Sequence, residues 1–187
     1  SFFIDELIVF DVSRNEKNIS KFCKALSSLT DGCFVPITAG GGIRTLDDAK
    51  SLLRAGADKV SINTSLFSDL SLAKELVINF GKQCVVGSID VKKTDQGEYE
   101  IWTESGSKIV NQDISSTLSS LEKDYIGEIY INSINQDGTG QGYDLDLLKK
   151  IPDMYPEINM AIKKISSCIG KGGKLMLCGN GGSAADA

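Results

Sequence analysis

Histidine is absent from the 187 residues of the chain. Its absence excludes Ser-His-Asp and Cys-His catalysis, and it leaves any proton transfer to Asp, Glu, Lys, Cys or Tyr side chains. Long apolar runs are missing as well, since none approaches the roughly 20 residues that a membrane-spanning helix needs. No stretch is typical of a signal peptide. We therefore expect no membrane partner.

An excess of positive charge is also missing. The chain has 20 basic and 25 acidic residues, a formal net charge of -5, and no long run of Lys or Arg. This balance excludes nucleic acid as an expected partner. Phosphorylated small molecules stay open, because backbone N–H groups bind them against the overall charge.

The five cysteines are odd in number and widely spaced. This usage predicts reduced core thiols in a cytoplasmic protein and shows no metal-ligand spacing. We expect no metal and no other cofactor. The five are Cys23, Cys33, Cys84, Cys168 and Cys178.

An apolar run, a polar loop and an amphipathic helix recur along most of the chain, which is typical of parallel βα units. Thr45 with Asp48 is expected to cap one helix, and Gly56 to end it. A break in the rhythm predicts a short exposed hairpin at 99–103 and 108–111. The fold class is therefore α/β, with parallel strands expected at residues 7–10, 34–38, 59–62, 84–89 and 128–131.

Two of the three prolines fall within residues 151–156, where the rhythm stops. We expect this stretch to be a linker between residues 1–150 and a second segment, residues 157–187. The second segment begins with an apolar helical stripe and continues with a strand at 174–178 and a glycine-rich loop. We expect both ends of the sequence to be cuts through longer elements.

Polar and glycine residues follow the predicted strands, and the carboxyl ends of parallel strands form the active face of βα folds. The run Gly40 to Gly42 allows close backbone approach to an anion, and the helix after it is expected to offer free N–H groups. A tight turn is the alternative for the glycines alone. Asn63 and Thr64, one strand later, favour a phosphate site.

Asp90 directly follows an apolar strand. A loop-fixing carboxylate is the commoner role at such a position, but the absence of histidine favours Asp90 as the general acid/base. Asp58 and Lys59 lie at the opposite end of their strand, where a solvated charge pair is the simple interpretation.

Three segments together resemble one family, the cyclase subunit of imidazole glycerol phosphate synthase (HisF), whose fold is a TIM (β/α)8 barrel. The resemblance covers about residues 6–150 and implies a partial barrel, units two to six. The segments are VPITAGGGIRTLDDAKSLLRAGADKVSINT (35–64), CVVGSIDVKK (84–93) and GEIYINSINQDGTGQGYD (127–144).

The resemblance also implies roles for individual residues. Asp90 matches the second catalytic aspartate of the family, whose first aspartate lies on a strand that this sequence lacks. Asp58 and Lys59 match positions that face a HisH-type glutaminase subunit, which delivers ammonia along the barrel. The implied phosphate-binding residues are Gly41, Gly42, Asn63 and Thr64 for one phosphate, and Asp137 and Gly138 for the other.

The family reaction joins ammonia to a phosphorylated ribulosyl aminoimidazole carboxamide, which gives imidazole glycerol phosphate and a carboxamide ribotide. The sequences SIDVKK and EIYINSI are more similar to variant cyclases of surface-polysaccharide gene clusters, which supply ammonia for sugar amidation. An inactive phosphate-binding scaffold is a third interpretation. An incomplete barrel is expected to be neither stable nor active as a monomer.

The last segment resembles a different family. Residues 163–187, KKISSCIGKGGKLMLCGNGGSAADA, are similar to the start of the sugar isomerase (SIS) domain of phosphoheptose isomerase. By that resemblance Asn180, Gly181 and Ser183 would bind a sugar phosphate. The whole chain would then combine a partial barrel with the first βα elements of an SIS-type α/β domain.

Overall fold

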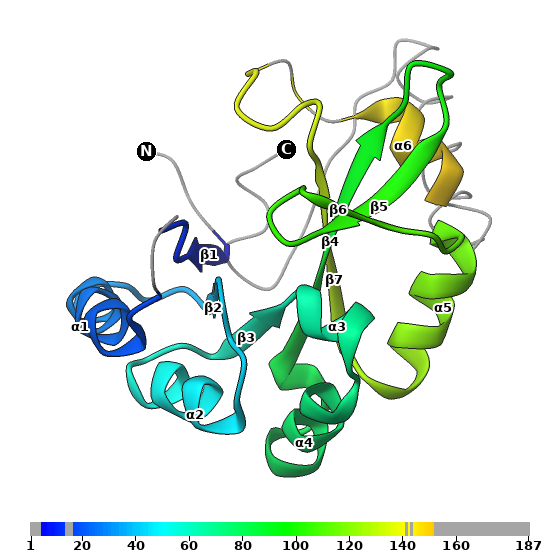
Figure 1. The fold of residues 1–187 in the computed structure, drawn as a ribbon. Helices are drawn as coiled ribbons and strands as arrows, with labels where there is room; N and C mark the ends of the chain where they lie inside the picture. The colour runs from blue at the N-terminus through cyan, green and yellow to red at the C-terminus, as the bar shows by residue number, and fades with distance from the viewer. Residues whose placement is uncertain (1–4, 14–16, 141, 143, 152–187) are drawn as a thin grey trace, which may run out of the picture.

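The computed structural model describes residues 5–13, 17–140, 142 and 144–151. A curved sheet of seven strands lies at its centre, with helices along its outer side (Figure 1). The strands are β1 (Leu7–Phe10), β2 (Ile37–Gly40), β3 (Lys59–Ile62), β4 (Val85–Lys93), β5 (Tyr99–Thr103), β6 (Lys108–Val110) and β7 (Glu128–Ser133). The helices are α1 (Ile19–Thr30), α2 (Leu46–Arg54), α3 (Thr64–Ser68), α4 (Ser71–Phe80), the 3₁₀ turn η1 (Lys82–Cys84), α5 (Ile114–Asp124) and α6 (Leu145–Lys150).

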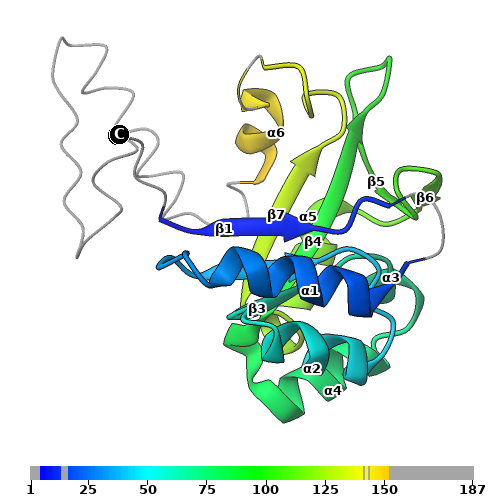
Figure 2. The same ribbon diagram turned by 90° about the vertical axis from the view of Figure 1, so that its left-hand side faces the viewer.

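Strands β1, β2, β3, β4 and β7 are parallel neighbours in that order, as successive βα units require. The long strand β4 is paired along both edges. Strand β7 pairs with residues 86–91, while β3 pairs with residues 85–87 and the antiparallel β5 with residues 90–93. Figure 2 shows β4 and β7 running side by side towards α6. The α/β class with a mostly parallel sheet is thus confirmed, in agreement with part of a barrel.

The pairing register gives each parallel strand two distinct faces. The outward residues are apolar and buried against the helices, and examples are Ala39, Val60 and Ile89, each 0% exposed. The inward residues are hydroxyl-bearing in the middle of the sheet, namely Thr38, Ser61 and Ser88. Helices α1, α2, α4 and α5 therefore cover the apolar side of the sheet, and the polar side chains lie on its inner side.

The predicted cap of α2 is confirmed. The Thr45 hydroxyl accepts a hydrogen bond from the Asp48 N–H at 3.1 Å, and the Asp48 carboxylate accepts from the Thr45 N–H at 3.0 Å. Gly56 follows the helix with φ +107°, a left-handed conformation that favours glycine. Local chemistry thus fixes both ends of this helix.

Several predicted elements differ in the structure, and one helix is new. The strand predicted at 84–89 extends over Val85–Lys93, so Asp90 lies within β4 and does not follow it. The second strand starts at Ile37 and not at residue 34, because Phe34 is 99% exposed and the Asp58 carboxylate holds the Ile37 N–H. The hairpin is not exposed on both sides, since Ile101 of β5 is 0% exposed beneath α5. Helix α3, directly after β3, was not predicted at all.

The linker from residue 152 onward and the predicted SIS-type segment lie outside the described residues, so Asn180, Gly181 and Ser183 have no place in this description. Within the described part of the chain, no helix combines the length and hydropathy needed to cross a bilayer. Cys23, Cys33 and Cys84 carry free thiols.

Gly41 is expected to tolerate no side chain. Its φ is +101°, and an added Cβ would lie 2.4 Å from the backbone oxygen of Asp11. Gly41→Ala should therefore lower the free energy of unfolding by about 2–5 kcal/mol, through backbone strain plus overpacking. Gly138→Ala is the matched control, because Gly138 has φ +71° with open space around it, and about 1 kcal/mol is expected. Urea unfolding followed by the fluorescence of the single tryptophan measures both; equal losses would contradict the close approach to Asp11.

Candidate active site

Three polar side chains meet at the carboxyl ends of adjacent strands, with Asp90 in the middle. The Asn63 amide donates a hydrogen bond to Asp90 Oδ2 at 3.0 Å, and the Asn132 amide donates to Asp90 Oδ1 at 3.1 Å. Asp90 and Asn132 are direct partners in the β4–β7 register. The carboxylate is therefore held by one donor on each oxygen.

The surroundings of Asp90 alter its acidity. Burial raises the pKa of Asp90 above its ordinary value, the two amide hydrogen bonds counter part of that rise, and the nearby Asp137 adds to it. Burial disfavours the charged form of a carboxyl group. A carboxyl group with a raised pKa exchanges protons closer to neutral pH, as a general acid/base must.

Asn63 also presents an unused acceptor. Its Oδ1 atom is buried and has no hydrogen-bond partner among the described residues. A buried acceptor without a partner is costly. A donor on a bound molecule would satisfy Asn63 Oδ1 at the place where its Nδ2 atom contacts Asp90.

The glycine run lies on the same edge of the sheet. Gly41 and Gly42 have φ of +101° and +91° and follow β2, the neighbour of β3. The expectation of free N–H groups at the start of α2 is wrong in part, since the N–H groups of Arg44, Thr45 and Asp48 all donate to the capping pair. An anion here would be bound by the loop backbone itself.

Lys17 places a cation beside the glycine run. A Cβ added at Gly42 would meet the Lys17 side chain at 2.9 Å, and the Lys17 ammonium bonds to the backbone oxygen of Asp11 and lies 3.6 Å from its carboxylate. Hydrogen bonds from Ser13 are the main cause that lowers the pKa of Asp11. The methylene groups of Lys17 thus lie against Gly42, while its ammonium is held by Asp11.

The other predicted site residues follow β3 and β7. Thr64 is the first residue of α3, next to Asn63. Asp137 and Gly138 lie in the loop after β7, and Asp137 is close enough to raise the pKa values of both Asp90 and Tyr130. The residues predicted from the strand ends thus gather on one edge of the sheet.

Lys59 lies at the opposite end of the inner face. Its ammonium contacts Glu6 at 3.0 Å and Glu128 at 2.7 Å, which joins the starts of β1, β3 and β7. Burial alone would lower the pKa of Lys59, but the hydrogen bonds to Glu128 and Glu6 raise it overall. The solvated Asp58–Lys59 pair is therefore wrong: Asp58 binds the Ile37 N–H at 2.8 Å and Lys59 binds two other carboxylates.

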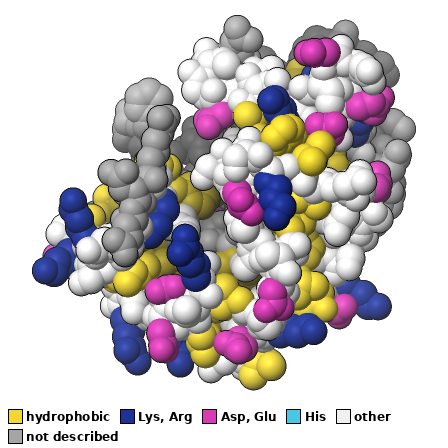
Figure 3. All heavy atoms as spheres, in the orientation of Figure 1, with side chains coloured by type: hydrophobic (Ala, Val, Ile, Leu, Met, Phe, Trp, Pro, Cys, Tyr) yellow, Lys and Arg dark blue, Asp and Glu magenta, His cyan; other side chains and the backbone are white. Residues whose placement is uncertain are grey.

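A shallow hollow opens at this end beside Asp58. Its volume is about 360 Å³, and its lining includes Cys33, Pro36 and the fully exposed Phe34. On the face drawn in Figure 3, acidic and basic side chains are interspersed, without a large area of one sign. No group of three or more Cys, Asp or Glu residues within the described ranges is arranged to hold a metal ion.

Comparison with known proteins shows the family to which the chain belongs. Residues 2–162 match the family described as "Histidine biosynthesis protein". The chain belongs to this family. Among its relatives, an imidazole glycerol phosphate synthase subunit HisF of Legionella pneumophila is 40% identical over 150 residues, which cover 80% of this chain and 71% of that protein.

Two further relatives carry the name "Putative imidazole glycerol phosphate synthase subunit hisF2". The one from Parasynechococcus marenigrum is 42% identical over 81% of this chain and 56% of its own length. The one from Pseudomonas aeruginosa is 34% identical over 98% of this chain and 66% of its own length. The chain thus spans 56% to 66% of the length of these two.

Four residues at the two ends of the sheet were not predicted from the sequence. They are Asn132, Glu128, Glu6 and Lys17. Glu128, Tyr130 and Asn132 alternate with the apolar Ile129 and Ile131 along β7, and that alternation was the signal for one inward face. Glu6 and Lys17 lie just before β1 and just before α1, and no sequence pattern marks them. Their partners Lys59 and Asp11 are known only from the fold.

The Asn132 amide is expected to hold down the pKa of Asp90. A donor to a carboxylate stabilises the charged form, so Asn132→Ala should raise the pKa of Asp90 further and shift its protonation to higher pH. Titration of ¹³C-labelled Asp carboxyl groups by NMR measures this without any substrate. Asn79→Ala is the control, because that amide donates to the Glu75 backbone oxygen on α4. An unchanged or lowered pKa of Asp90 would contradict the assignment.

Proposed function

We propose that this chain acts as a HisF-type cyclase subunit in histidine biosynthesis, which joins ammonia to a phosphorylated ribulosyl aminoimidazole carboxamide. One observation carries the proposal: Asp90 is a half-buried carboxyl group with a raised pKa, held on both oxygens by Asn63 and Asn132. The family match and the names of the relatives support the same reaction.

The two phosphates of the substrate would bind on either side of Asp90. The backbone of Gly41 and Gly42, with Asn63 and Thr64, takes one phosphate, and the Lys17 ammonium neutralises part of its charge. The loop with Asp137 and Gly138 takes the other. A substrate bound at both ends presents its middle to Asp90, which supports a reaction at that point.

Asp90 would move protons in this arrangement. As ammonia adds to the carbonyl carbon of the ribulosyl group, its nitrogen loses a proton to the Asp90 carboxylate and the carbonyl oxygen leaves as water. The protonated carboxyl group then returns a proton to the nitrogen of the carboxamide ribotide as the bond to this leaving group breaks. The amides of Asn63 and Asn132 keep the carboxylate in place in both states. The raised pKa suits both transfers.

A glutaminase subunit would supply the ammonia from the other end of the sheet. There Lys59, Glu6 and Glu128 join three strands across the inner face, and the hollow beside Asp58 with the exposed Phe34 offers an apolar contact. Large exposed aromatic side chains are typical anchors of protein interfaces. Asp58 would act indirectly, by fixing the start of β2.

Asp90→Asn is expected to lower kcat by roughly 100-fold to 10,000-fold with little change in KM, since it removes the titrating proton but keeps the size of the side chain. The ribotide with ammonium chloride, in the presence of the glutaminase subunit, is the assay. Asp95→Asn in the turn between β4 and β5 is the control. Turnover of the Asp90 variant within a factor of two would overturn its role.

A parent chain that binds inorganic phosphate and stimulates the glutaminase, yet never consumes the ribotide, would favour the phosphate-binding scaffold. Turnover of ammonia with a sugar acceptor alone would favour the variant cyclase of surface-polysaccharide synthesis. Each of these results excludes the histidine pathway as the role of this chain.

Phe34→Asp is expected to weaken glutaminase binding by about 10-fold to 100-fold, because loss of an aromatic anchor at an interface costs about 2 kcal/mol. Ile78→Asp is the matched control, since Ile78 is 82% exposed on α4, away from the hollow. Isothermal titration of the two chains measures both constants. Equal affinities for the two variants would place the partner elsewhere.

The proposal for residues 157–187 remains their resemblance to the start of an SIS domain. Its support is the sequence GNGGSA, in which Asn180, Gly181 and Ser183 would hold a sugar phosphate. The match to the histidine biosynthesis family ends at residue 162, but the hisF2 protein of Pseudomonas aeruginosa aligns over 98% of this chain, which includes most of this segment. A sugar-phosphate site in this segment would be additional to the one around Asp90.

A further inference from the structure

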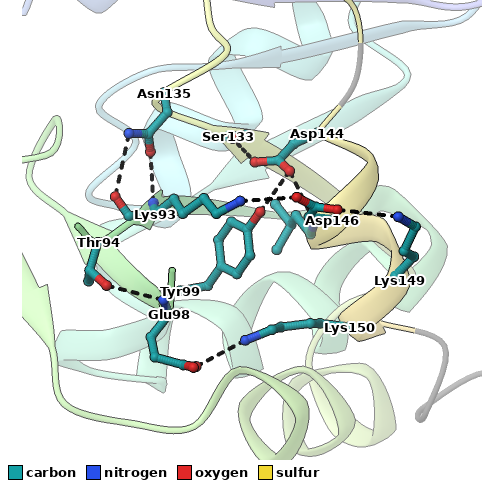
Figure 4. Close-up of polar contacts among 11 residues, drawn as sticks. Lys93, Thr94, Glu98, Tyr99, Ser133, Asn135, Asp144, Asp146, Lys149 and Lys150 are labelled. Atoms are coloured by element: carbon teal, nitrogen blue, oxygen red, sulfur yellow. Dashed lines mark hydrogen bonds and ion pairs between the residues drawn. The ribbon is translucent and has the colours of Figure 1, made fainter. Parts of the chain in front are cut away.

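The loop between β7 and α6, residues 134–144, is tied at its start to the end of β4. The Asn135 side chain accepts a hydrogen bond from the Lys93 N–H at 2.7 Å and donates to the Lys93 carbonyl at 3.4 Å (Figure 4). The Ile134 N–H also donates to the Val91 carbonyl at 2.8 Å. The first residues of this loop, which we call the β7–α6 loop, therefore follow β4.

The end of the β7–α6 loop is tied to β5 through one carboxylate. The Tyr99 hydroxyl donates to Asp144 Oδ1 at 2.7 Å, and the Ser133 hydroxyl donates to Asp144 Oδ2 at 2.9 Å. The Leu147 N–H donates to the same Oδ1 at 3.1 Å, so Asp144 also caps α6. A single side chain thus connects β5, β7 and the first turn of α6.

The charge states of Tyr99 and Asp144 favour the hydrogen bond between them. Burial alone would raise the pKa of Asp144, but the hydrogen bonds from Tyr99, Leu147 and Ser133 bring it below the ordinary value. Burial and the bond to Asp144 raise the pKa of Tyr99. A protonated hydroxyl therefore faces a charged carboxylate around neutral pH, and hydrogen bonds to a charged partner are the stronger ones.

The Tyr99 ring is itself held in place. Figure 4 shows it between the side chains of Lys93 and Lys150, whose ammonium groups each lie 5.4 Å from the ring centre. The Lys93 ammonium forms an ion pair with the Asp146 carboxylate at 3.1 Å, and the Lys150 ammonium forms one with the Glu98 carboxylate at 2.9 Å. The hydroxyl of a ring fixed in this way points to Asp144 with little freedom.

The part of the loop between the two ties carries Asp137 and Gly138. Among the described residues, the backbone hydrogen bonds of this part are local, for example from the Asp137 N–H to the Ser133 carbonyl at 2.9 Å. Such local bonds shape the loop, and the ties at Asn135 and Asp144 join it to β4 and β5.

We infer that Tyr99 is a positioning residue that acts through Asp144 to hold the β7–α6 loop in its phosphate-binding position. The inference rests on the proposed function in assigning a substrate phosphate to this loop. The hairpin of β4 and β5 carries no phosphate ligand itself. Through Tyr99 it nevertheless sets the affinity of the loop for that phosphate.

The test compares Tyr99→Phe with Glu104→Gln. The first change removes only the hydroxyl that bonds to Asp144, and the second removes a charge from the exposed ion pair with Lys108 in the turn between β5 and β6. Hydrogen exchange of the Gln136, Asp137 and Thr139 amides reports on the loop. Affinity for inorganic phosphate is measured by fluorescence of Trp102, which pairs with Asp90 in the β4–β5 register and is the single tryptophan.

For Tyr99→Phe we expect faster exchange of the loop amides and about tenfold weaker phosphate binding. In turnover KM for the ribotide should rise with kcat unchanged, because Asp90 keeps its partners. Glu104→Gln should change none of these. Unchanged exchange in a folded Tyr99→Phe chain would overturn the inference, and faster exchange with unchanged affinity would overturn the link to phosphate.

Failure of the proposed function gives a different result. If the parent chain shows no saturable response to phosphate, no phosphate binds at this loop, while the exchange rates still decide whether Tyr99 positions it. Ser133→Ala removes the other side-chain donor to Asp144 and keeps the test decisive if Tyr99→Phe does not fold. Faster exchange in that variant supports the role of the Asp144 carboxylate, and unchanged exchange overturns it.

Discussion

The pairing of β4 along both of its edges is the constraint on which the rest of the structure depends. The register places Asp90 opposite Asn132 of β7 and opposite Trp102 of β5. A slip of one residue would turn every side chain of the strand to the other face. Asp90 would then face the helices, and Ile89 would face the inner side of the sheet. The apolar packing of β4 against the helices therefore also determines where the carboxylate lies.

Curvature follows from contacts between strands that are distant in the sheet. Phe10 of β1 and Tyr130 of β7 face each other with ring centres 5.7 Å apart, and Lys59 joins Glu6 of β1 to Glu128 of β7. Both contacts lie on the inner side and span three intervening strands. They draw the outermost parallel strands of the described sheet together, as in part of a barrel.

The sequence predicted what local chemistry determines. The cap at Thr45, the helix end at Gly56 and the choice of Asp90 as a candidate carboxylate needed only their neighbours in the chain. The second strand was misplaced because Asp58, 21 residues away from Ile37, fixes its start. Asn132, Lys17 and Glu6 were missed because their roles come from strand pairing and from loops that meet in space.

The two ends of the inner face offer a reactant different groups, which bears on how reactants reach Asp90 in the proposed reaction. At the start of the strands one cation, Lys59, is held by two carboxylates, Glu6 and Glu128, and its raised pKa keeps it charged and paired with them. A cation paired in this way is not available to a phosphate. At the Asp90 end, the positive-φ glycine run follows β2, and the buried Asn63 Oδ1 atom has no hydrogen-bond partner among the described residues. A phosphorylated substrate would therefore enter from the Asp90 end, which leaves the other end to a small uncharged molecule such as ammonia.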